Sequence, residues 1–389
     1  MIDYSKILSD TIVGIKPSGI RKFFDIANTM EDVISLGVGE PDFRTPWQIR
    51  SAGIRSLEKG QTRYTSNRGL EALREELARY VERKYSVTYN PLSDILVTVG
   101  GSEAIDAAIR AIVNPGDEVI IPQPSYVCYE PITRLAGGVP VIIRTKAEND
   151  FKITPDELLE KITDRTKALI LPYPCNPTGA IMEKKDLEAI AAVLRERDII
   201  VISDEIYAEL TFGATHTSIA SIPGMKERTI LINGFSKAFS MTGWRLGYAC
   251  GPAEIMKQIT KIHQFAIMCA PTTSQHAACE ALRACNEEVE RMKEEYDIRR
   301  RIIVKGFSDL GLSCREPKGA FYAFPSIKST GMTSDEFCEK LLYSKRVAIV
   351  PGTAFGEGGE GFVRASYCYS VNHIKEALNR IGEFLEEIR

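Results

Sequence analysis

The sequence predicts an α/β fold: a large domain with a mostly parallel seven-stranded sheet sandwiched by helices, and a smaller α+β domain. The first observation is that short apolar runs alternate with helical patterns between residues 95 and 250, as they do where crossover helices join parallel strands. The second is that a helix-rich stretch after residue 251 leads into a separate set of apolar runs. The third is the length of 389 residues, which suits two domains.

The predicted elements are assigned in chain order. Residues 1–45 form an N-terminal segment that belongs to the small domain and covers the ligand, residues 46–285 form the large domain, and residues 286–389 form the small C-terminal α+β domain. The predicted strands of the large domain are residues 95–99, 118–122, 139–143, 168–171, 199–203, 229–232 and 246–250. Those of the small domain are residues 319–324, 347–350 and 362–366.

The composition favours a small-molecule ligand. The formal net charge is -3 and charges of both signs are mixed along the chain, so no basic field attracts nucleic acid or an anionic membrane. No run approaches the roughly 18 apolar residues of a membrane span, and the N-terminus lacks the pattern of a secretory signal. We therefore expect a cytoplasmic protein with neither a nucleic-acid nor a membrane partner.

The cysteines and histidines predict neither disulfides nor a metal site. Nine cysteines are an odd number, and they form no C-x-x-C pair, which fits buried free thiols better than a disulfide framework. None of the four histidines pairs with a second histidine or a glutamate at the spacing of metal ligands. We expect no metal cofactor.

The stretch 233–248, NGFSKAFSMTGWRLGY, carries a lysine just after the predicted strand 229–232. Ligands of open α/β folds bind in the crevice at the carboxyl ends of the strands, so Lys237 is expected to face a ligand. Burial and cationic neighbours lower the pKa of such an amine and make it a nucleophile. Taken alone, Lys237 would be an ordinary surface lysine, and the other strand ends decide between these interpretations.

Four other strand ends carry polar or aromatic residues. Gly101 and Ser102 open a helix after strand 95–99, and free backbone N–H groups there can bind a phosphate. Tyr126 follows strand 118–122 and offers a ring for stacking on a heteroaromatic group. Asn176 lies in the turn after strand 168–171, and Asp204 follows strand 199–203, where its carboxylate needs a cationic or proton-bearing partner.

Each of these features alone is typical of an ordinary turn or core residue. Together they predict a ligand with a phosphate, an aromatic ring, a ring nitrogen able to bind a proton, a phenolic oxygen and an aldehyde that can react with the lysine amine. Pyridoxal 5′-phosphate has all five groups, and we predict it as the cofactor of the large domain.

The motifs, taken in order, resemble those of the class I and II aminotransferases among the fold type I pyridoxal-phosphate enzymes, over nearly the whole chain. The segment SKAFSMTGWRLGY is similar to the family's lysine signature. The segments NPTG, DEIY, GGSEA, GEPDF and FVRASY are similar to its other site motifs. The segments SGIRKFFDIA, LPYPCNPTGA and PKGAFYAFPSIKSTGMTS are similar to aminotransferases acting on aromatic amino acids and on N-acetyl-diaminopimelate.

The resemblance implies roles for the matched residues. Lys237 would bind the cofactor covalently and move the proton, and Asp204 would hold a proton on the ring nitrogen. Tyr207, the third catalytic residue, would bind the phenolic oxygen together with Asn176. The remaining cofactor contacts would be Tyr126 stacked on the ring and, around the phosphate, Gly101, Ser102, the backbone of Glu103, Ser236 and Arg245. Arg245 would supply the fixed charge and fork geometry.

The resemblance also implies a substrate site and a partner. Arg364 would pair with the substrate α-carboxylate, helped by Asn176 and the backbone of Gly39. The protein would move an amino group between an aromatic, aspartate-like or N-acetyl-diaminopimelate-like L-amino acid and a 2-oxo acid such as 2-oxoglutarate, with Lys237 as base and then as acid. It would form a homodimer in which Tyr64 reaches the phosphate of the neighbouring subunit.

Two further points of the sequence concern single contacts. Many members of the family have a serine or threonine three residues before the lysine, where this chain has Gly234, so the phosphate would lose a hydroxyl donor that backbone N–H groups or Tyr64 would replace. We also expect residues 15–24 to form a lid over the substrate. Arg21 or Lys22 would reach a distal carboxylate if either is not simply a solvated helix residue.

Two alternatives remain open from the sequence. The first is a pyridoxal-phosphate C–S β-lyase or another non-transaminating enzyme of this fold, because the motifs mark only the proton abstraction that these reactions share. The second is a cofactor-binding regulator. The sequence has no appended basic helix-turn-helix region that would favour such a regulator.

Overall fold

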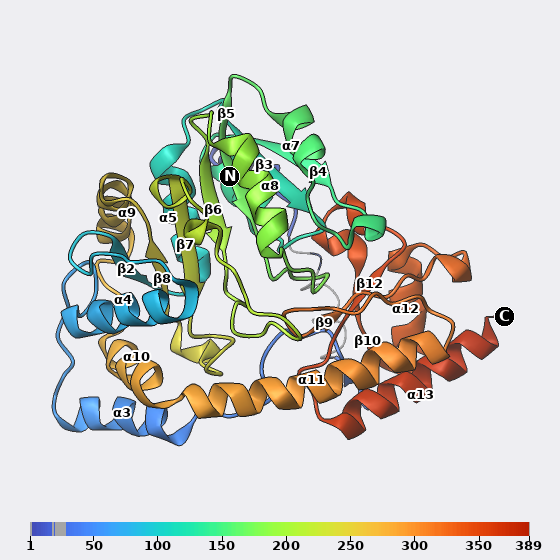
Figure 1. The fold of residues 1–389 in the computed structure, drawn as a ribbon. Helices are drawn as coiled ribbons and strands as arrows, with labels where there is room; N and C mark the ends of the chain where they lie inside the picture. Colours follow the sequence, from blue (N-terminus) through green and yellow to red (C-terminus); the bar gives the residue numbers. More distant parts are fainter. Residues whose placement is uncertain (1, 18, 20–28, 389) are drawn as a thin grey trace.

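The computed structural model describes residues 2–17, 19 and 29–388, and its central feature is a seven-stranded sheet with the order β2-β8-β7-β6-β5-β3-β4 (Figure 1). The strands are β2 (Ile95–Thr98), β3 (Glu118–Gln123), β4 (Val139–Arg144), β5 (Thr166–Leu171), β6 (Ile200–Asp204), β7 (Thr229–Gly234) and β8 (Gly247–Cys250). Strand β8 is antiparallel to both of its neighbours, and the other pairs are parallel. The predicted mostly parallel sheet is therefore confirmed.

Helices cover both faces of this sheet. One face carries α5 (Gly101–Ile112), α6 (Tyr129–Leu135) and α9 (Ala253–Ala266). The other carries α4 (Glu71–Tyr85), α7 (Pro155–Lys161), α8 (Lys184–Leu194) and α10 (Thr272–Ala284), with α3 (Trp47–Glu58) packed on α10. Successive strand residues point to opposite faces, so Ile230 and Ile232 pack against the first layer and Leu231 against the second.

A second, smaller group of strands lies beside the large sheet (Figure 1). Strands β11 (Val350–Pro351), β12 (Val363–Ser366) and β9 (Tyr322–Ala323) form an antiparallel sheet, and β1 (Ile34–Ser35) pairs in parallel with β10 (Val347–Ala348). The long α11 (Asn286–Asp309) leads from the layer of α10 to this group, where it packs on α13 (Val371–Glu387), and α13 in turn packs on α12 (Ser334–Lys345).

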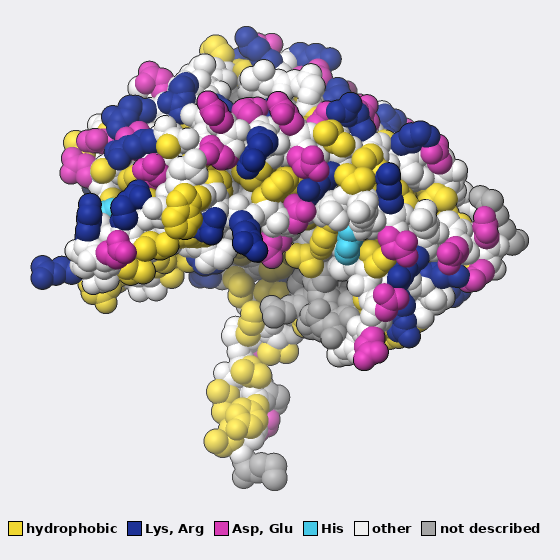
Figure 2. Space-filling model, turned by 90° about the horizontal axis from the view of Figure 1, so that it is seen from below, with side chains coloured by type: hydrophobic (Ala, Val, Ile, Leu, Met, Phe, Trp, Pro, Cys, Tyr) yellow, Lys and Arg dark blue, Asp and Glu magenta, His cyan; other side chains and the backbone are white. Residues whose placement is uncertain are grey.

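The N-terminal residues include a short helix, α1 (Asp10–Val13), and six large apolar side chains that are exposed: Ile2, Tyr4, Ile7, Leu8, Ile12 and Val13. Figure 2 shows a narrow arm with a largely apolar surface that projects from the body. Arg21 and Lys22 lie outside the described residues, as does most of the predicted lid 15–24.

Two features are absent from the described residues. No helix among them combines the length and apolar character needed to cross a bilayer. No group of three or more histidine, cysteine, aspartate or glutamate side chains in the same part of the chain is arranged to hold a metal ion.

Candidate active site

A cavity of about 690 Å³ lies at the carboxyl-end edge of the large sheet, where residues following several of its strands meet residues of the smaller sheets. It brings together all but two of the predicted site residues: Gly39, Gly101, Ser102, Tyr126, Asn176, Asp204, Tyr207, Ser236, Lys237, Arg245 and Arg364. The two predicted residues that do not line the cavity are Glu103 and Tyr64. The carboxyl ends of parallel strands share one edge of a sheet, which explains why residues so far apart in sequence converge.

Lys237 lies just beyond the end of β7, and its amine faces the cavity. The Nζ atom donates a hydrogen bond of 2.8 Å to the carbonyl oxygen of Gly39. It also lies 5.9 Å from the ring centroid of Tyr207 and 5.7 Å from that of Phe321. Burial among these groups lowers the pKa of Lys237 to about 8, because the low-dielectric surroundings disfavour the charged ammonium. At neutral pH a far larger share of this amine is therefore neutral and nucleophilic than for an ordinary lysine.

Asp204 is the last residue of β6, and its carboxylate is buried. Its Oδ2 atom accepts a hydrogen bond of 2.7 Å from the hydroxyl of Tyr129, and its Oδ1 atom accepts one of 3.2 Å from the backbone N–H of Ile206. Both donors are neutral, and burial raises the pKa of Asp204 although the bond from Tyr129 opposes this shift. A cation or a proton-bearing nitrogen in the cavity would stabilise the ionised form.

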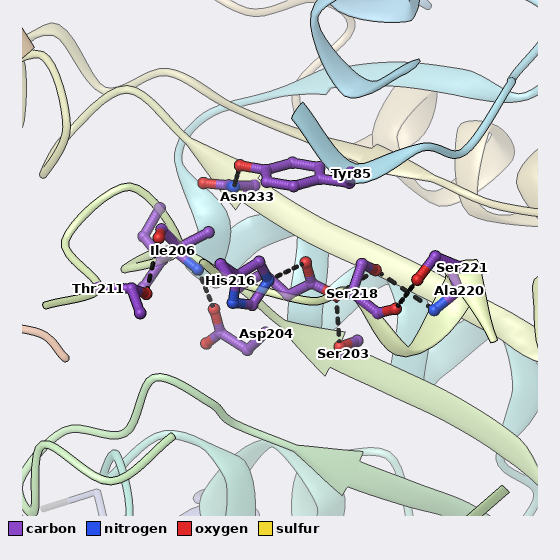
Figure 3. A network of polar contacts seen from close by, with 12 residues as sticks. Tyr85, Ser203, Asp204, Ile206, Thr211, His216, Ser218, Ala220, Ser221 and Asn233 are labelled. Carbon is purple, nitrogen blue, oxygen red and sulfur yellow. Dashed lines mark hydrogen bonds and ion pairs between the residues drawn. The ribbon is translucent and has the colours of Figure 1, made fainter. Parts of the chain in front are cut away.

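The neighbouring carboxylate, Glu205, points to the other side of β6 and anchors the end of the strand. It accepts hydrogen bonds of 2.8 Å from Ser203 and 2.7 Å from Ser218, and its second oxygen lies 2.7 Å from Nε2 of His216. Figure 3 shows the Asp204 carboxylate turned toward Ile206, whereas Ser203 and Ser218 lie on its other side. Because alternate strand residues face opposite ways, anchoring Glu205 directs Asp204 into the cavity.

The first turn of α5 and Arg245 form the cationic part of the cavity. Gly101 and Ser102 begin the helix, so their backbone N–H groups have no partner within it. Gly100, which precedes the helix, has a φ of +79°, and a Cβ there would lie 2.9 Å from Nη2 of Arg245. A glycine is therefore required for the guanidinium of Arg245 to approach this turn.

Glu103 turns its side chain away from the cavity. Its carboxylate accepts a hydrogen bond from the backbone N–H of Val99 and lies 2.6 Å from Nδ1 of His263, a buried residue of α9. The carboxylate thus joins the end of β2 and α9 to the turn that opens α5. Only the backbone of Glu103 remains available for a ligand, which is the part that the motif resemblance implied.

Arg364 lies on β12, and its guanidinium is buried between two aromatic rings. Its Cζ atom is 4.4 Å from the ring centroid of Tyr322 and 4.7 Å from that of Phe355. Nη1 donates a hydrogen bond of 2.9 Å to Oδ1 of Asn176, and Nη2 donates to the carbonyl oxygen of Gly37. The buried Nε atom has no partner among the described residues, so a donor remains for an anionic ligand.

A steric constraint that the sequence did not reveal explains why position 234 is a glycine. A Cβ at this position would lie 3.0 Å from Cδ1 of Ile206, 3.0 Å from the carbonyl oxygen of Leu246 and 3.1 Å from Cα of Gly247. The backbone of β8 therefore packs where a serine or threonine side chain would begin. Restoring that hydroxyl requires a shift of the β7–β8 pair.

Sequence reasoning missed Tyr129 and Tyr322, which both line the cavity. Tyr129 begins α6, three residues after Tyr126, and because Tyr126 precedes the helix no helical spacing pointed to Tyr129. Tyr322 lies in a segment that the sequence analysis identified as a strand and as similar to certain aminotransferases, without assigning Tyr322 a role. Its contact with Tyr207 joins residues 115 positions apart and had no local signal.

The cavity has the groups that a phosphorylated pyridine aldehyde requires. The first turn of α5 and Arg245 provide backbone donors and a fixed cation for a phosphate. Asp204 is a buried carboxylate without a cationic hydrogen-bond donor, which suits a protonated ring nitrogen. Lys237 provides a partly neutral amine for the aldehyde. The residues therefore fit pyridoxal 5′-phosphate.

Comparison with known proteins gives consistent results. The family model of aminotransferase class I and II matches residues 31–381. The chain is 54% identical to YugH of Bacillus subtilis, a protein named as an aminotransferase, and 46% identical to the aspartate aminotransferase of Pyrococcus abyssi, covering 98% of each chain in both cases. The solved structure of an aromatic aminotransferase from Pyrococcus horikoshii matches with a TM-score of 0.90 and 45% identity, over 94% of this chain and 99% of that one.

Proposed function

Because the chain belongs to the class I and II aminotransferases, as its motifs predicted, we propose that the cavity binds pyridoxal 5′-phosphate and is the site of transamination. The chain is an enzyme that moves amino groups between amino acids and 2-oxo acids, and its family generally depends on this cofactor. The observation that supports the site most strongly is that Lys237, Asp204 and Arg245 line one cavity.

The bound cofactor supplies an aldehyde for covalent attachment and an electron-poor ring that takes up the electron pair left when the substrate's α-proton departs. The amine of Lys237 holds the cofactor and, once the amino donor displaces it, removes the α-proton as a base and returns a proton as an acid. The carboxylate of Asp204 keeps a proton on the ring nitrogen. The hydrogen bond from Tyr129 fixes the direction of that carboxylate.

The other residues bind and orient the ligands. Backbone N–H groups of the first turn of α5, including that of Glu103, surround the phosphate together with the hydroxyls of Ser102 and Ser236 and the guanidinium of Arg245. Tyr126 stacks on the ring, and Asn176 and Tyr207 bind the phenolic oxygen.

Arg364 pairs with the substrate α-carboxylate, and its stacking between Tyr322 and Phe355 keeps the guanidinium in place for this contact. Asn176 bonds to the same guanidinium and helps to bind the substrate, as does the backbone of Gly39.

The amino donor is tested directly with purified holoenzyme and 2-oxoglutarate. The relatives compared above include an aspartate and an aromatic aminotransferase, so the donors are aspartate, phenylalanine and N-acetyl-LL-diaminopimelate. We expect at least one donor to yield glutamate and its own 2-oxo acid in equal amounts, measured by chromatography. Pyruvate release from cystathionine without any 2-oxo acid measures β-elimination. Formation of pyruvate, with no glutamate from any donor, would reject the proposal.

The pKa of Lys237 predicts how cofactor capture depends on pH. Only the neutral amine attacks the aldehyde, so its rate of reaction with pyridoxal 5′-phosphate should rise with pH and level off near pH 8, where the buried amine loses its proton. The reaction rate of an ordinary lysine would keep rising up to about pH 10.4. The rate is measured as the growth of visible absorbance after the cofactor-free protein is mixed with the cofactor. A rate that continues to climb well above pH 9 would contradict the lowered pKa.

We also propose a homodimer in which Tyr64 reaches the partner's phosphate. Tyr64 is 81% exposed in one protomer and does not line that protomer's own cavity. Other large apolar side chains nearby are exposed, notably Phe265 at 87% and Met268 at 45%. The loop of Tyr64 contacts this region, because the side chain of Asn67 donates a hydrogen bond of 2.9 Å to the carbonyl oxygen of Met268. A second copy would cover this surface.

We propose that residues 46–285 form the cofactor-binding domain and that residues 1–45 and 286–389 form the small domain. The parallel pairing of β1 with β10 supports this division. We propose a cytoplasmic location because all nine cysteines are free, as expected in a reducing compartment.

A further inference from the structure

We propose that Tyr322 is a positioning residue whose hydroxyl donates its proton to the hydroxyl of Tyr207, which leaves the Tyr207 proton free for the phenolic oxygen of the cofactor. The inference rests on the role proposed for Tyr207. Tyr322 begins β9 and lines the cavity, and its side chain is 1% exposed. It belongs to the small antiparallel sheet, whereas Tyr207 follows β6 of the large sheet.

The hydroxyls of Tyr322 and Tyr207 share one hydrogen bond, and one of the two supplies its proton. The two hydroxyl oxygens lie 2.8 Å apart, and either atom has the geometry to donate. A tyrosine hydroxyl carries one proton and can also accept hydrogen bonds, so only one of the two protons lies between the oxygens. If Tyr322 donates, Tyr207 keeps its proton for a third group. If Tyr207 donates, it offers the cofactor only a lone pair, which repels an anionic oxygen.

The position of Arg364 distinguishes the two hydroxyls. The guanidinium of Arg364 lies over the ring of Tyr322, with 4.4 Å between Cζ and the ring centroid. A positive charge beside a phenol makes its hydroxyl more acidic and hence a stronger donor. Burial raises the pKa of both phenols and the charge of Arg364 opposes the shift in both, but the guanidinium stacks directly on the ring of Tyr322. The stacked guanidinium therefore favours Tyr322 as the donor.

The surrounding packing fixes the rings of Tyr207 and Tyr322. The rings of Tyr207 and Tyr322 meet edge to face, with 5.8 Å between centroids, and Phe321 packs on Tyr207 in the same way at 5.4 Å. A Cβ at Gly39 would lie only 1.8 Å from the Tyr322 hydroxyl oxygen. The glycine of the GEPDF segment thus makes room for this hydroxyl, and water has little access to replace the Tyr322–Tyr207 bond.

The test titrates the visible absorbance of the holoenzyme against pH. A hydrogen bond donated to the phenolic oxygen stabilises its deprotonated form, so loss of that bond raises the pH midpoint of the spectral change. We expect Tyr207→Phe to raise the midpoint by about 0.4 to 1 pH unit, as for the loss of one neutral hydrogen bond. Tyr322→Phe should raise it by a smaller amount, because Tyr207 keeps its own proton but loses the donor that orients and polarises its hydroxyl. In the Tyr207→Phe background, Tyr322→Phe should add no further rise, because Tyr322 acts through Tyr207.

A matched control and a second perturbation make the outcome clear. Tyr367→Phe removes another buried tyrosine hydroxyl, which donates to the carbonyl oxygen of Ala320 at 3.2 Å outside the cavity lining, and should leave the midpoint unchanged. Gly39→Ala displaces the Tyr322 hydroxyl without removing it, and should raise the midpoint as Tyr322→Phe does. It provides the same test if Tyr322→Phe does not fold.

The possible results separate the inference from the function on which it rests. A midpoint that Tyr207→Phe fails to move would contradict the role of Tyr207 itself. A midpoint that moves with Tyr207→Phe but stays within about 0.1 pH unit in Tyr322→Phe and Gly39→Ala would overturn the inference alone. Additive shifts in the double variant would also overturn it, because Tyr322 would then act independently of Tyr207.

Discussion

Lys237→Ala should lower kcat/KM for transamination by about 10⁴-fold, the upper range for removal of a positioned acid–base group. The variant loses both the amine that attaches the cofactor and the base that removes the α-proton, and no other amine lines the cavity among the described residues. Cofactor added to the variant should also leave on gel filtration, because only non-covalent contacts hold it. The measurements are steady-state kinetics with the best donor and the cofactor content after gel filtration.

A matched control for this variant is Lys261→Ala. Lys261 is an exposed lysine of α9 whose amine bonds to Gln258 at 2.8 Å and to no other residue in the described part of the chain, so its loss should change kcat/KM less than twofold. If Lys237→Ala transaminates at a rate near that of the wild type, or retains the cofactor as firmly as Lys261→Ala does, the catalytic role of Lys237 is refuted.

Asp204→Asn should lower kcat by about 10- to 100-fold, the equivalent of one hydrogen bond to a charged group. A neutral amide does not hold a proton on the ring nitrogen as a carboxylate does, so the ring takes up electrons less readily. Asp106→Asn is the matched control, because Asp106 pairs with Arg110 on an outer face of α5, away from the cavity. A kcat equal to that of the control would show that Asp204 does not touch the cofactor.

Thermal unfolding of the cofactor-free proteins gives an independent check on Asp204. The folded-state pKa of Asp204 is raised by burial, so the folded protein binds this proton more tightly than the unfolded chain. The Asp204 contribution to stability therefore falls as pH rises from about 3.9 through the raised pKa. Above that range, cofactor-free Asp204→Asn should have a Tm at or above that of the wild type. The rise in Tm on adding cofactor should be smaller in the variant.

The large sheet was predictable because its signals are local. Each of the seven strands is a short apolar run between helical patterns, and alternate residues such as Leu231 and Ile232 serve opposite layers. The predicted strands 319–324, 347–350 and 362–366 overlap β9, β10 with β11, and β12, but at two to four residues per strand their lengths and partners were not predictable. Strands β1 and β10 pair although they lie over 300 residues apart, and no pattern in either segment predicts this pairing.

The sequence by itself determined the chemistry of the cavity. Lys237, Asp204 and the Gly101–Ser102 turn each follow a strand, and in a parallel sheet such positions share one edge, so their convergence followed from order along the chain. The tertiary structure alone decided which residues support them. Tyr129 bonds to Asp204, His263 to Glu103, and Tyr322 to Tyr207. These partners come from other strands and helices, and packing of whole elements brings them within hydrogen-bond distance.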